Sequence, residues 1–425
     1  MKKNIFLWSL YDFANSIIMI VFLFYFSQWI VVDSGKPDWW YNATLVVSSI
    51  LFILTAPSIG RRIDMTGNKI SGLRWTTVIT IGLYAVTTGI TLFAPSQVLL
   101  AVILFTLALY FYLMSFVYYT PMMNDLSTEA NRSQISGIGE GANYVGQVFG
   151  LLVTLPFATG SIYLFGTHGR VQALLPSLVL FALLALPMLI WYKEKHVEKD
   201  AEAFGEASGG SGGAGKISLM NEYRGIVAVM KRIFSIKNLF YLFVGYFLFS
   251  DALLTFSNNF PIFLEKVHGV SDAAKTYLSV GILLLAGVGS WAVGKIADWK
   301  GKKPVMIFLL ASWCIILPLI AFVHSFTLLV IICLAGGFIF GPVWGVSRAM
   351  VADYTPPDMA ASSFSFYIIA ERFATFIGPI AWSVVLASTA SSGKASYSYG
   401  LISLAVLVFV GLLFTMKIKS KTVAK

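Results

Sequence analysis

Charged side chains are scarce in this sequence. Only 12% of its 425 residues are Asp, Glu, Lys or Arg, against about 25% in ordinary soluble domains, while 57% are hydrophobic. So little charge excludes a globular surface of the usual water-soluble kind. What the chain has instead is a series of apolar runs of roughly 20 residues, each long enough to cross a bilayer core of about 30 Å as a helix.

Patterns that carry catalysis or metal binding are also missing. The chain has four histidines and two cysteines, and both Cys314 and Cys333 fall inside predicted helices, where we interpret them as packing residues. There is no HExxH, no Walker-type phosphate loop and no cluster with metal-ligand spacing. We therefore predict that the protein is not an enzyme or an ATP-driven pump, and we predict no cofactor and no metal site.

The apolar runs predict an all-α membrane protein with about twelve transmembrane helices. Backbone groups in lipid must be hydrogen-bonded internally, and runs without period-2 alternation indicate helices and not a β-barrel. The first six predicted spans are residues 5–31, 41–59, 72–94, 97–122, 134–158 and 172–192. The second six are residues 238–262, 273–296, 304–323, 327–349, 361–387 and 396–416.

A polar segment divides the chain into two pseudo-symmetric six-helix bundles. Residues 193–237 begin with KEKHVEKDAE and continue with the Gly/Ser-rich GEASGGSGGAGK, which favours flexible coil. The part from Ile217 to Phe234 mixes apolar and basic residues and could form an interfacial helix. We expect an N-terminal bundle at 1–192, a cytoplasmic linker at 193–237 and a C-terminal bundle at 238–425.

The positions of the basic residues predict the orientation. The net charge is +10, and most of the 30 Lys and Arg fall in the N-terminus, the linker, the C-terminal tail and the loops on the same side. The exceptions on the other side are Lys36, Arg170, Lys266, Lys275 and Lys394. The positive-inside rule then places both termini in the cytoplasm. We expect a multi-pass protein of the cell (inner) membrane rather than an organelle membrane, and no nucleic-acid partner.

Two loops at equivalent places in the two halves repeat the same pattern. GRRIDMTGNK begins at Gly60, and GKIADWKGKK begins at Gly294. The matched positions are Gly60, Asp64, Gly67 and Lys69 in the first loop and Gly294, Asp298, Gly301 and Lys303 in the second. Further matches at a nearly constant offset are Asp125 with Asp353 and Gly150 with Gly378. Several matches in register indicate an internal duplication.

At these loops the chain resembles the major facilitator superfamily, whose halves carry a GxxxDxxGxK-like loop between helices two and three. Four segments are similar to the vacuole-effluxer branch, which contains the autophagy-related vacuolar amino-acid exporters and their prokaryotic relatives: YDFANS from Tyr11, YFLFSDALLT from Tyr246, GPVWGVSRAMVADYTPP from Gly341 and ERFATFIGP from Glu371. The resemblance implies two six-helix bundles that rock around a site near the membrane midplane.

The repeated loops are predicted to act as cytoplasmic gating motifs. Their glycines permit close helix approach and tight turns, and their aspartates can accept from helix N-terminal amides and pair with basic neighbours such as Arg348. The alternative is a topology signal with capped short loops. The predicted gating residues are Gly60, Asp64, Gly67, Lys69, Gly294, Asp298, Gly301, Lys303, Arg348 and Asp353.

Acidic side chains inside the predicted helices mark the candidate site. A charge at the bilayer centre costs about 2.5 to 3.5 kcal/mol on insertion scales, so each such acid needs a partner, a proton or water. Together with neutral polar and aromatic neighbours, the predicted substrate or proton-coupling residues are Asp12, Asn15, Glu140, Asn143, Asp251, Asn258, Asn259, Trp344, Glu371 and Arg372.

Several of these roles stay open at the level of sequence. Asp12 lies about two turns from a helix end and is either a cavity residue or a structural hydrogen-bond acceptor. Arg372 could bind a substrate carboxylate, pair with Glu140 across the halves, or neutralise Asp12. An apolar cavity favours protonated carboxylates, which makes Glu140, Asp251 and Glu371 candidates for proton coupling.

Glycine-rich faces in residues 134–158 and 273–296 offer a further clue. Small residues let helices approach closely and slide. These faces either form a rocking surface between the halves or pack within each half.

We therefore predict a secondary active transporter that works by alternating access. Its solute is small and polar or amphiphilic, with an amino acid or related metabolite as the first candidate and proton coupling as an option. The alternatives are a sugar or lipid-headgroup carrier and, less favoured, a channel or receptor. The predicted partners are the solute, the lipid bilayer and, if transport is proton-coupled, protons. We expect a monomer.

Overall fold

The structure is a computed structural model of the chain. It describes residues 2–66, 68–127, 132–194, 231, 234–355, 367 and 376–419. Within these stretches the side chains of residues 57–58, 60–62, 64–66, 124, 132–134, 136–137 and 140 are not described.

Six α-helices form the N-terminal group. Helix α1 continues through two π-helical segments, Phe22–Phe26 and Trp29–Asp33, and a short 3-10 helix at Arg170–Ala173 leads into α6. The six are α1 (Lys2–Val21), α2 (Asp38–Thr66), α3 (Ile70–Phe93), α4 (Val98–Leu126), α5 (Arg132–Ala158) and α6 (Leu174–Trp191).

Six more helices form the C-terminal group. They are α9 (Lys237–His268), α10 (Asp272–Lys300), α11 (Lys302–Phe322), α12 (Phe326–Tyr354), α14 (Ile377–Ser388) and α15 (Ala395–Met416). A short 3-10 helix at Ala390–Ser392 joins the last two. No strand occurs in the described stretches, and ten of their helices are long and apolar enough to cross a membrane. The prediction of an all-α membrane protein is therefore confirmed.

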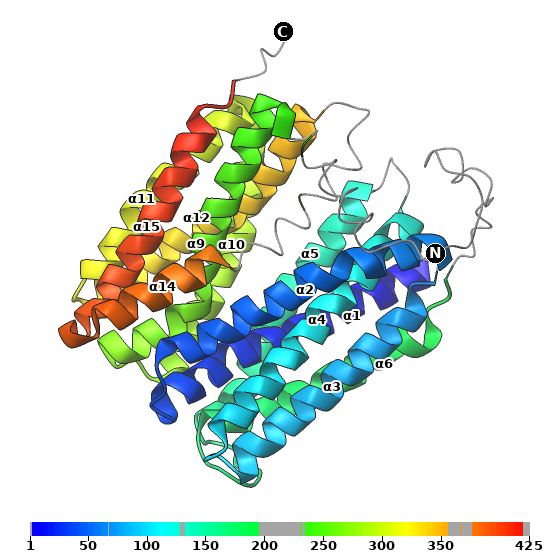
Figure 1. Ribbon diagram of the computed structural model, residues 1–425, viewed down its shortest axis with the longest axis vertical. Coiled ribbons are helices and arrows are strands. Elements are labelled where there is room, and N and C mark those ends of the chain that lie inside the picture. The colour runs from blue at the N-terminus through cyan, green and yellow to red at the C-terminus, as the bar shows by residue number, and fades with distance from the viewer. Residues whose placement is uncertain are drawn as a thin grey trace.

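The two groups touch at one end and diverge at the other. Figure 1 shows the helices of both groups converging away from the chain termini and separating toward the end where the termini lie. Two helix pairs cross between the groups, because α5 packs against α10 and α2 packs against α14. We call the converging end the closed end and the other the open end.

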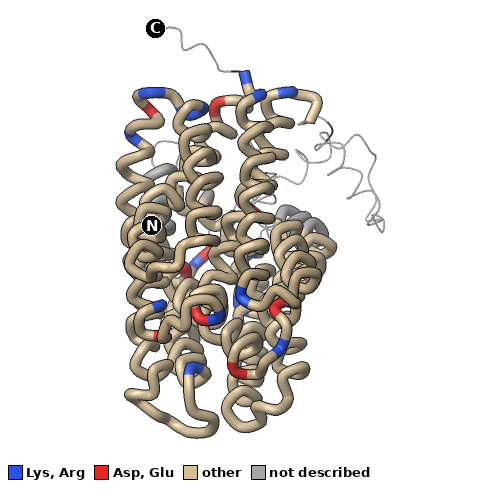
Figure 2. Tube along the Cα trace, turned by 90° about the vertical axis from the view of Figure 1, so that its left-hand side faces the viewer, with Lys and Arg blue, Asp and Glu red and all other residues tan. Residues whose placement is uncertain are grey.

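Charged residues gather near the helix ends, with long uncharged stretches between them (Figure 2). The open end carries mainly Lys and Arg, whereas the closed end carries both signs of charge. Large hydrophobic side chains such as Trp75, Trp291 and Phe308 remain exposed along the outer faces of the helices. That pattern is the one expected of helices whose solvent is lipid.

The close glycine contacts lie within each group. On α5, Gly146 and Gly150 meet the backbone of α1 at Phe13 and Ile17. On α10, Gly289 meets the backbone of Phe338 on α12. Helices α5 and α10 do pack against each other, but these glycines serve tight packing inside the groups. We therefore expect each group to move as a rigid body.

Two glycines on α10 allow a matched test of this packing. A Cβ at Gly289 would overlap the carbonyl oxygen of Phe338, whereas one at Gly287 would meet nothing within 4 Å. We expect Gly289→Ala to lower the free energy of unfolding by about 1 to 3 kcal/mol, because overpacking forces backbone shifts. Gly287→Ala should be neutral or slightly stabilising, since alanine is the better helix former. Thermal unfolding in detergent measures both, and equal melting temperatures would contradict the packing argument.

Candidate functional site at the contact between the two helix groups

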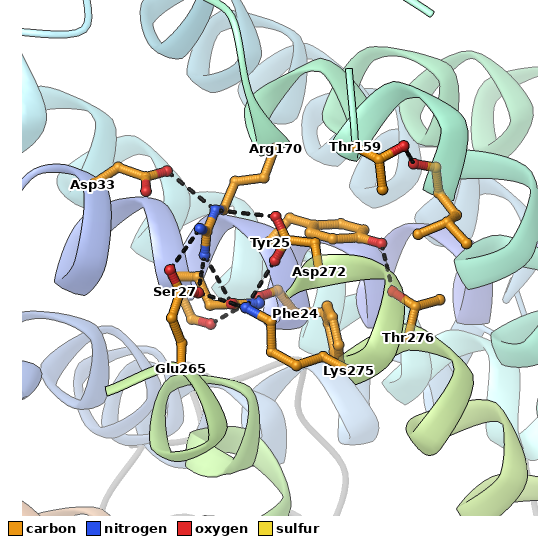
Figure 3. Close-up of polar contacts among 12 residues, drawn as sticks. Phe24, Tyr25, Ser27, Asp33, Thr159, Arg170, Glu265, Asp272, Lys275 and Thr276 are labelled. Carbon is orange, nitrogen blue, oxygen red and sulfur yellow. Dashed lines mark hydrogen bonds and ion pairs between the residues drawn. The ribbon is translucent and has the colours of Figure 1, made fainter. Parts of the chain in front are cut away.

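A cluster of charged residues joins the two groups at the closed end. Figure 3 shows Arg170 at its centre, with carboxylates around it and Lys275 beside it. Three members come from the N-terminal group and three from the C-terminal group. The six residues of this closed-end cluster are Gln28, Asp33, Arg170, Glu265, Asp272 and Lys275.

Local turns place the C-terminal members of the cluster. Helix α9 ends at His268. The next residue, Gly269, has a φ of 65° and donates its N–H to the carbonyl of Glu265, which closes the last turn. Such left-handed endings suit glycine, which has no Cβ. Ser271 then caps α10 by accepting from the N–H of Ala274. The end of α9 and the first turn of α10 are thus held together, and their acids and lysine share one space.

Arg170 has partners on both sides of the contact. Its Nη1 and Nη2 donate to the two carboxylate oxygens of Glu265 at 2.5 and 2.8 Å. Its Nε lies 3.2 Å from Asp33 Oδ2 and 3.5 Å from Asp272 Oδ2. Paired, two-pronged contacts of this kind are the strongest that a guanidinium makes with a carboxylate.

Lys275 is the most buried charge of the cluster, because its side chain is 0% exposed. Its Nζ lies 2.5 Å from Glu265 Oε2 and 2.7 Å from Asp272 Oδ1. It also donates to the side-chain oxygen of Gln28, which accepts from Arg170 as well. A buried ammonium is tolerated only when acceptors surround it, and here three acceptors do.

Three further hydrogen-bonded contacts cross between the groups. The hydroxyls of Tyr25 and Thr276 are 2.9 Å apart. The side-chain amides of Asn42 and Asn259 bond each other reciprocally, at 3.1 and 3.0 Å. Tyr397 donates to Asp38 at 2.9 Å. Asn259, predicted as a substrate residue, therefore lies in the contact between α2 and α9.

A pocket of about 550 Å³ lies next to the cluster on its N-terminal side. Its lining includes Trp29, Asp33, Lys36, His168, Arg170 and Asp272. Charged groups of both signs line it, and three of them belong to the cluster, so this side of the cluster faces water while Lys275 is fully buried.

The predicted residues of α1 are buried in the N-terminal group. Asp12 is 9% exposed, and its Oδ2 lies next to Gly139 of α5. Asn15 is fully buried, and neither of its side-chain polar atoms has a hydrogen-bond partner among the described residues. Nearby, Trp8 stacks on Tyr119 with ring centroids 5.0 Å apart. This part of α1 combines an acid, an amide and aromatic rings.

Asp251 lies against the start of another helix. Its Oδ2 accepts from the backbone N–H of Gly378 at 2.6 Å, one residue into α14. The first N–H groups of a helix lack intrahelical partners, and the helix dipole favours a negative charge there. A Cβ at Gly378 would overlap Thr255 Oγ1, so α9 and α14 touch closely here. The geometry of Asp251 is that of a helix-capping residue.

Aromatic and cationic side chains meet on the C-terminal group. Arg348 of α12 lies over the ring of Tyr367, with its guanidinium carbon 5.9 Å from the ring centroid. Tyr367 also contacts Tyr246 of α9, with centroids 4.6 Å apart, and donates to the carbonyl of Trp344 at 3.4 Å. Trp344 and Arg348 are half-buried. Tyr367 therefore links Trp344 to a cation that lies about one helical turn further along α12.

The repeated loops form equivalent ion pairs, one in each group. Lys69 binds Asp125 at 2.5 Å between α3 and α4, and Lys302 binds Asp353 at 2.7 Å between α11 and α12. The second pair uses Lys302 and not Lys303, the residue that matches Lys69 in the alignment of the repeats. Both pairs stay inside one group.

Other gating residues have plainer surroundings. Asp298 is exposed at the end of α10, near the half-buried Gly294, and Gly301 has a φ of 95° where α11 begins. Glu194, which the sequence did not single out, accepts from the backbone N–H of Lys69 at 2.8 Å. That contact caps the start of α3.

Some predicted residues lie outside the described part of the chain. Gly67, Glu371 and Arg372 fall in undescribed segments, and so do the side-chain positions of Gly60, Asp64 and Glu140. Of the remaining predictions, Asn143 accepts from Gln147 at 2.6 Å within α5, and Asn258 is half-buried on α9.

The closed-end cluster was missed by the sequence reasoning, although a signal existed. Arg170 and Lys275 are two of the five basic residues that break the charge asymmetry, and acids accompany them at Glu265 and Asp272. Few cations are expected on the side of the membrane opposite the cytoplasm. A cation that does occur there, with acids nearby at helix ends, indicates an ion pair rather than a solvated side chain.

Comparisons with known proteins agree with this architecture. A family model described as Major Facilitator Superfamily matches residues 5–379 and 293–424. An uncharacterised MFS-type transporter of Bacillus subtilis, YxiO, is 23% identical over 424 residues, which covers 95% of this chain and 94% of that protein. Autophagy-related protein 22 of Candida glabrata is 25% identical over 187 residues, which covers 41% of this chain and 33% of that protein.

Solved structures share the fold. The nucleoside transporter NupG in a mutant form superposes with a TM-score of 0.73 at 13% identity, over 98% of this chain and 100% of that chain. A bacterial homologue of the human lysosomal transporter Spinster, in an inward-facing and unoccupied conformation, has a TM-score of 0.71 at 13% identity, over 99% of this chain and 98% of that chain.

The contact of Asp251 with α14 gives a test of its role. We expect Asp251→Ala to lower the free energy of unfolding by about 1 to 2 kcal/mol, because the cap is lost, and Asp251→Asn to lower it less, since an amide oxygen still accepts. Thermal unfolding without added solute measures both, with Asn258→Ala on the same helix as the control. An unchanged melting temperature for Asp251→Ala together with lost transport would assign Asp251 to solute or proton binding instead.

Proposed function

Because the chain belongs to the major facilitator superfamily of transporters, we propose that it is a secondary active transporter that moves a small polar or amphiphilic solute by alternating access. The observation that carries the proposal is the asymmetric contact of the two helix groups. They are joined by polar and charged side chains at the closed end and diverge at the open end. Hydrogen bonds and ion pairs can break and reform in water, as a reversible contact requires.

The orientation of the open end follows from charge. The end where the termini lie carries mainly Lys and Arg, and the positive-inside rule assigns such an end to the cytoplasm. We propose that this end faces the cytoplasm, so that the arrangement corresponds to an inward-open state with its outer side closed. We propose the same boundaries as the sequence predicts, with a bundle at 1–192, a cytoplasmic linker at 193–237 and a bundle at 238–425.

An amino acid is the proposed first candidate for the solute. The resemblance of the YDFANS and YFLFSDALLT segments to vacuolar amino-acid exporters favours it. The side chains agree, because Asp12 lies on the N-terminal group and Arg348 on the C-terminal group, each among aromatic rings. An acid on one group and a guanidinium on the other suit a zwitterion whose two charges are bound by different halves.

Proton coupling is proposed through carboxylates other than Asp251. Asp251 Oδ2 accepts from the first turn of α14, which favours a structural role, while its buried Oδ1 has no hydrogen-bond partner among the described residues. Asp12, Glu140 and Glu371 are the acids left for this function. A sugar or lipid-headgroup carrier is the second proposal for the solute class, supported by the neutral Asn15, which is buried without a described partner.

Counterflow in proteoliposomes tests the proposed function. Purified protein is first screened by thermal stabilisation against amino acids, sugars and organic anions at two pH values. The best solute is then loaded inside the vesicles, and uptake of labelled solute is followed from outside. A carrier gives saturable counterflow and a transient overshoot, whereas conductive flux without saturation would indicate a channel and reject the proposal.

A cross-link at the closed end should stop exchange without preventing binding. In a variant with Cys314 and Cys333 replaced by Ala, we expect Asn42→Cys and Asn259→Cys to be joined through disulfides by a short bis-methanethiosulfonate cross-linker, because their amides are in contact. Counterflow should then be lost, solute-induced stabilisation should persist, and a reductant should restore counterflow.

The matched control places both cysteines in one group. Ser398 on α15 bonds the carbonyl of Ala321 on α11 at 2.6 Å, so Ser398→Cys with Ala321→Cys forms a link inside the C-terminal group. That link should leave counterflow intact. Counterflow that survives the Asn42 to Asn259 link would show that transport needs no separation of the groups at this end.

A further inference from the structure

Asp33 differs from the other carboxylates around Arg170 because it belongs to the same helix group as the arginine. We propose that Asp33 drives the release of the closed end, by repelling the carboxylates of the opposite group and by holding Arg170 once they leave. The inference rests on the proposed alternating access, and it assigns Asp33 a positioning role that acts through Arg170.

Separation of the groups would break some bonds of the closed-end cluster and leave others intact. The bonds that break are those of Arg170 with Glu265 and Asp272 and that of Lys275 with Gln28. The bonds that remain are Arg170 with Asp33 in one group and Lys275 with Glu265 and Asp272 in the other. Neither cation is left without a carboxylate. This arrangement lowers the cost of opening, since breaking a buried pair is most expensive when one charge is abandoned.

Repulsion between like charges in the cluster also favours separation of the two groups. Three carboxylates, Asp33, Glu265 and Asp272, surround two cations, so one negative charge is in excess. Asp33 is close enough to Glu265 and Asp272 to repel both, and both belong to the other group. The opposite group also holds Lys275, which attracts Asp33, but its two carboxylates outnumber that single cation. Arg170 attracts all three carboxylates and holds the cluster together. The charge of Asp33 therefore opposes closure, whereas the charge of Glu265 favours it.

The neighbouring charges of the pocket have other partners. Lys36 lies over the ring of Trp40, with its Nζ 5.2 Å from the centroid. His168 stacks on Tyr163 at 4.1 Å between centroids. Both are contacts within the N-terminal group, so they stay formed when the groups separate. Within the closed-end cluster the exchange of partners involves Arg170 and Lys275, while the contacts of Tyr25 with Thr276, of Asn42 with Asn259 and of Tyr397 with Asp38 also cross between the groups and must break.

Opposite effects are expected from neutralising two acids that bind the same arginine. Spin labels at Ser161→Cys and Ser392→Cys, exposed at the closed end on different groups, report the separation by pulsed electron resonance in the variant without native cysteines. Glu265→Gln should raise the ratio of open to closed molecules about tenfold, because a buried two-pronged pair is lost. Asp33→Asn added to Glu265→Gln should lower that ratio about threefold, because Arg170 then has no carboxylate in the open form. The effect is modest because the ion pair of Asp33 with Arg170 is partly exposed to water.

A conservative variant and a surface variant complete the test. Asp33→Glu on the same background should keep the ratio of Glu265→Gln alone, because the charge remains and the site is partly exposed. Lys394→Gln removes an exposed cation whose Nζ donates to the carbonyl of Val267 in its own group, and it should leave the ratio unchanged. A rise in the open fraction on Asp33→Asn would overturn the inference while leaving alternating access standing. An absence of the open form in every variant, together with absent counterflow, would overturn the proposed function and the inference with it.

Discussion

The contact between the two helix groups depends on two cations that have little water around them. Lys275 is wholly buried and Arg170 nearly so, and each is stable there only while carboxylates enclose it. A hydrophobic seam of the same size would hold the groups together without regard to charge. An ion cluster holds them only in one arrangement, because displacement by a few ångströms removes the partners and admits water. The closed end is therefore specific and reversible at once.

Rigidity within each group is the counterpart of that reversible contact. Where α10 meets α12 and α5 meets α1, glycines bring backbones into direct contact, and backbone cannot rearrange as long side chains can. The ion pairs of Lys69 with Asp125 and of Lys302 with Asp353 also close on residues of the same group. Motion is thereby directed to the boundary between groups, where the joining contacts are polar.

The fold was predictable because its causes are local. Apolar runs longer than a bilayer crossing fixed the helices, and the duplicated loops indicated two related halves with Asp125 and Asp353 at equivalent places. The site was less predictable, because its causes lie in tertiary contacts. Nothing near Asp251 in the sequence shows that α14 begins beside it, and residues as distant as Gln28, Arg170 and Glu265 meet only after both groups have packed. The choice of Lys302 over Lys303 depends likewise on the direction in which α11 starts.

The two ends of the molecule differ in a way that bears on how it could move. Among the described residues of the open end, the ion pairs of Lys69 with Asp125 and of Lys302 with Asp353 lie inside the groups and survive any rigid rotation of one group against the other. At the closed end the strongest pairs cross between the groups and must be exchanged in such a rotation. A rotation therefore meets its main electrostatic barrier at the closed end. Because each group keeps an acid for its own cation, that barrier is the cost of exchanging partners and not of exposing a bare charge.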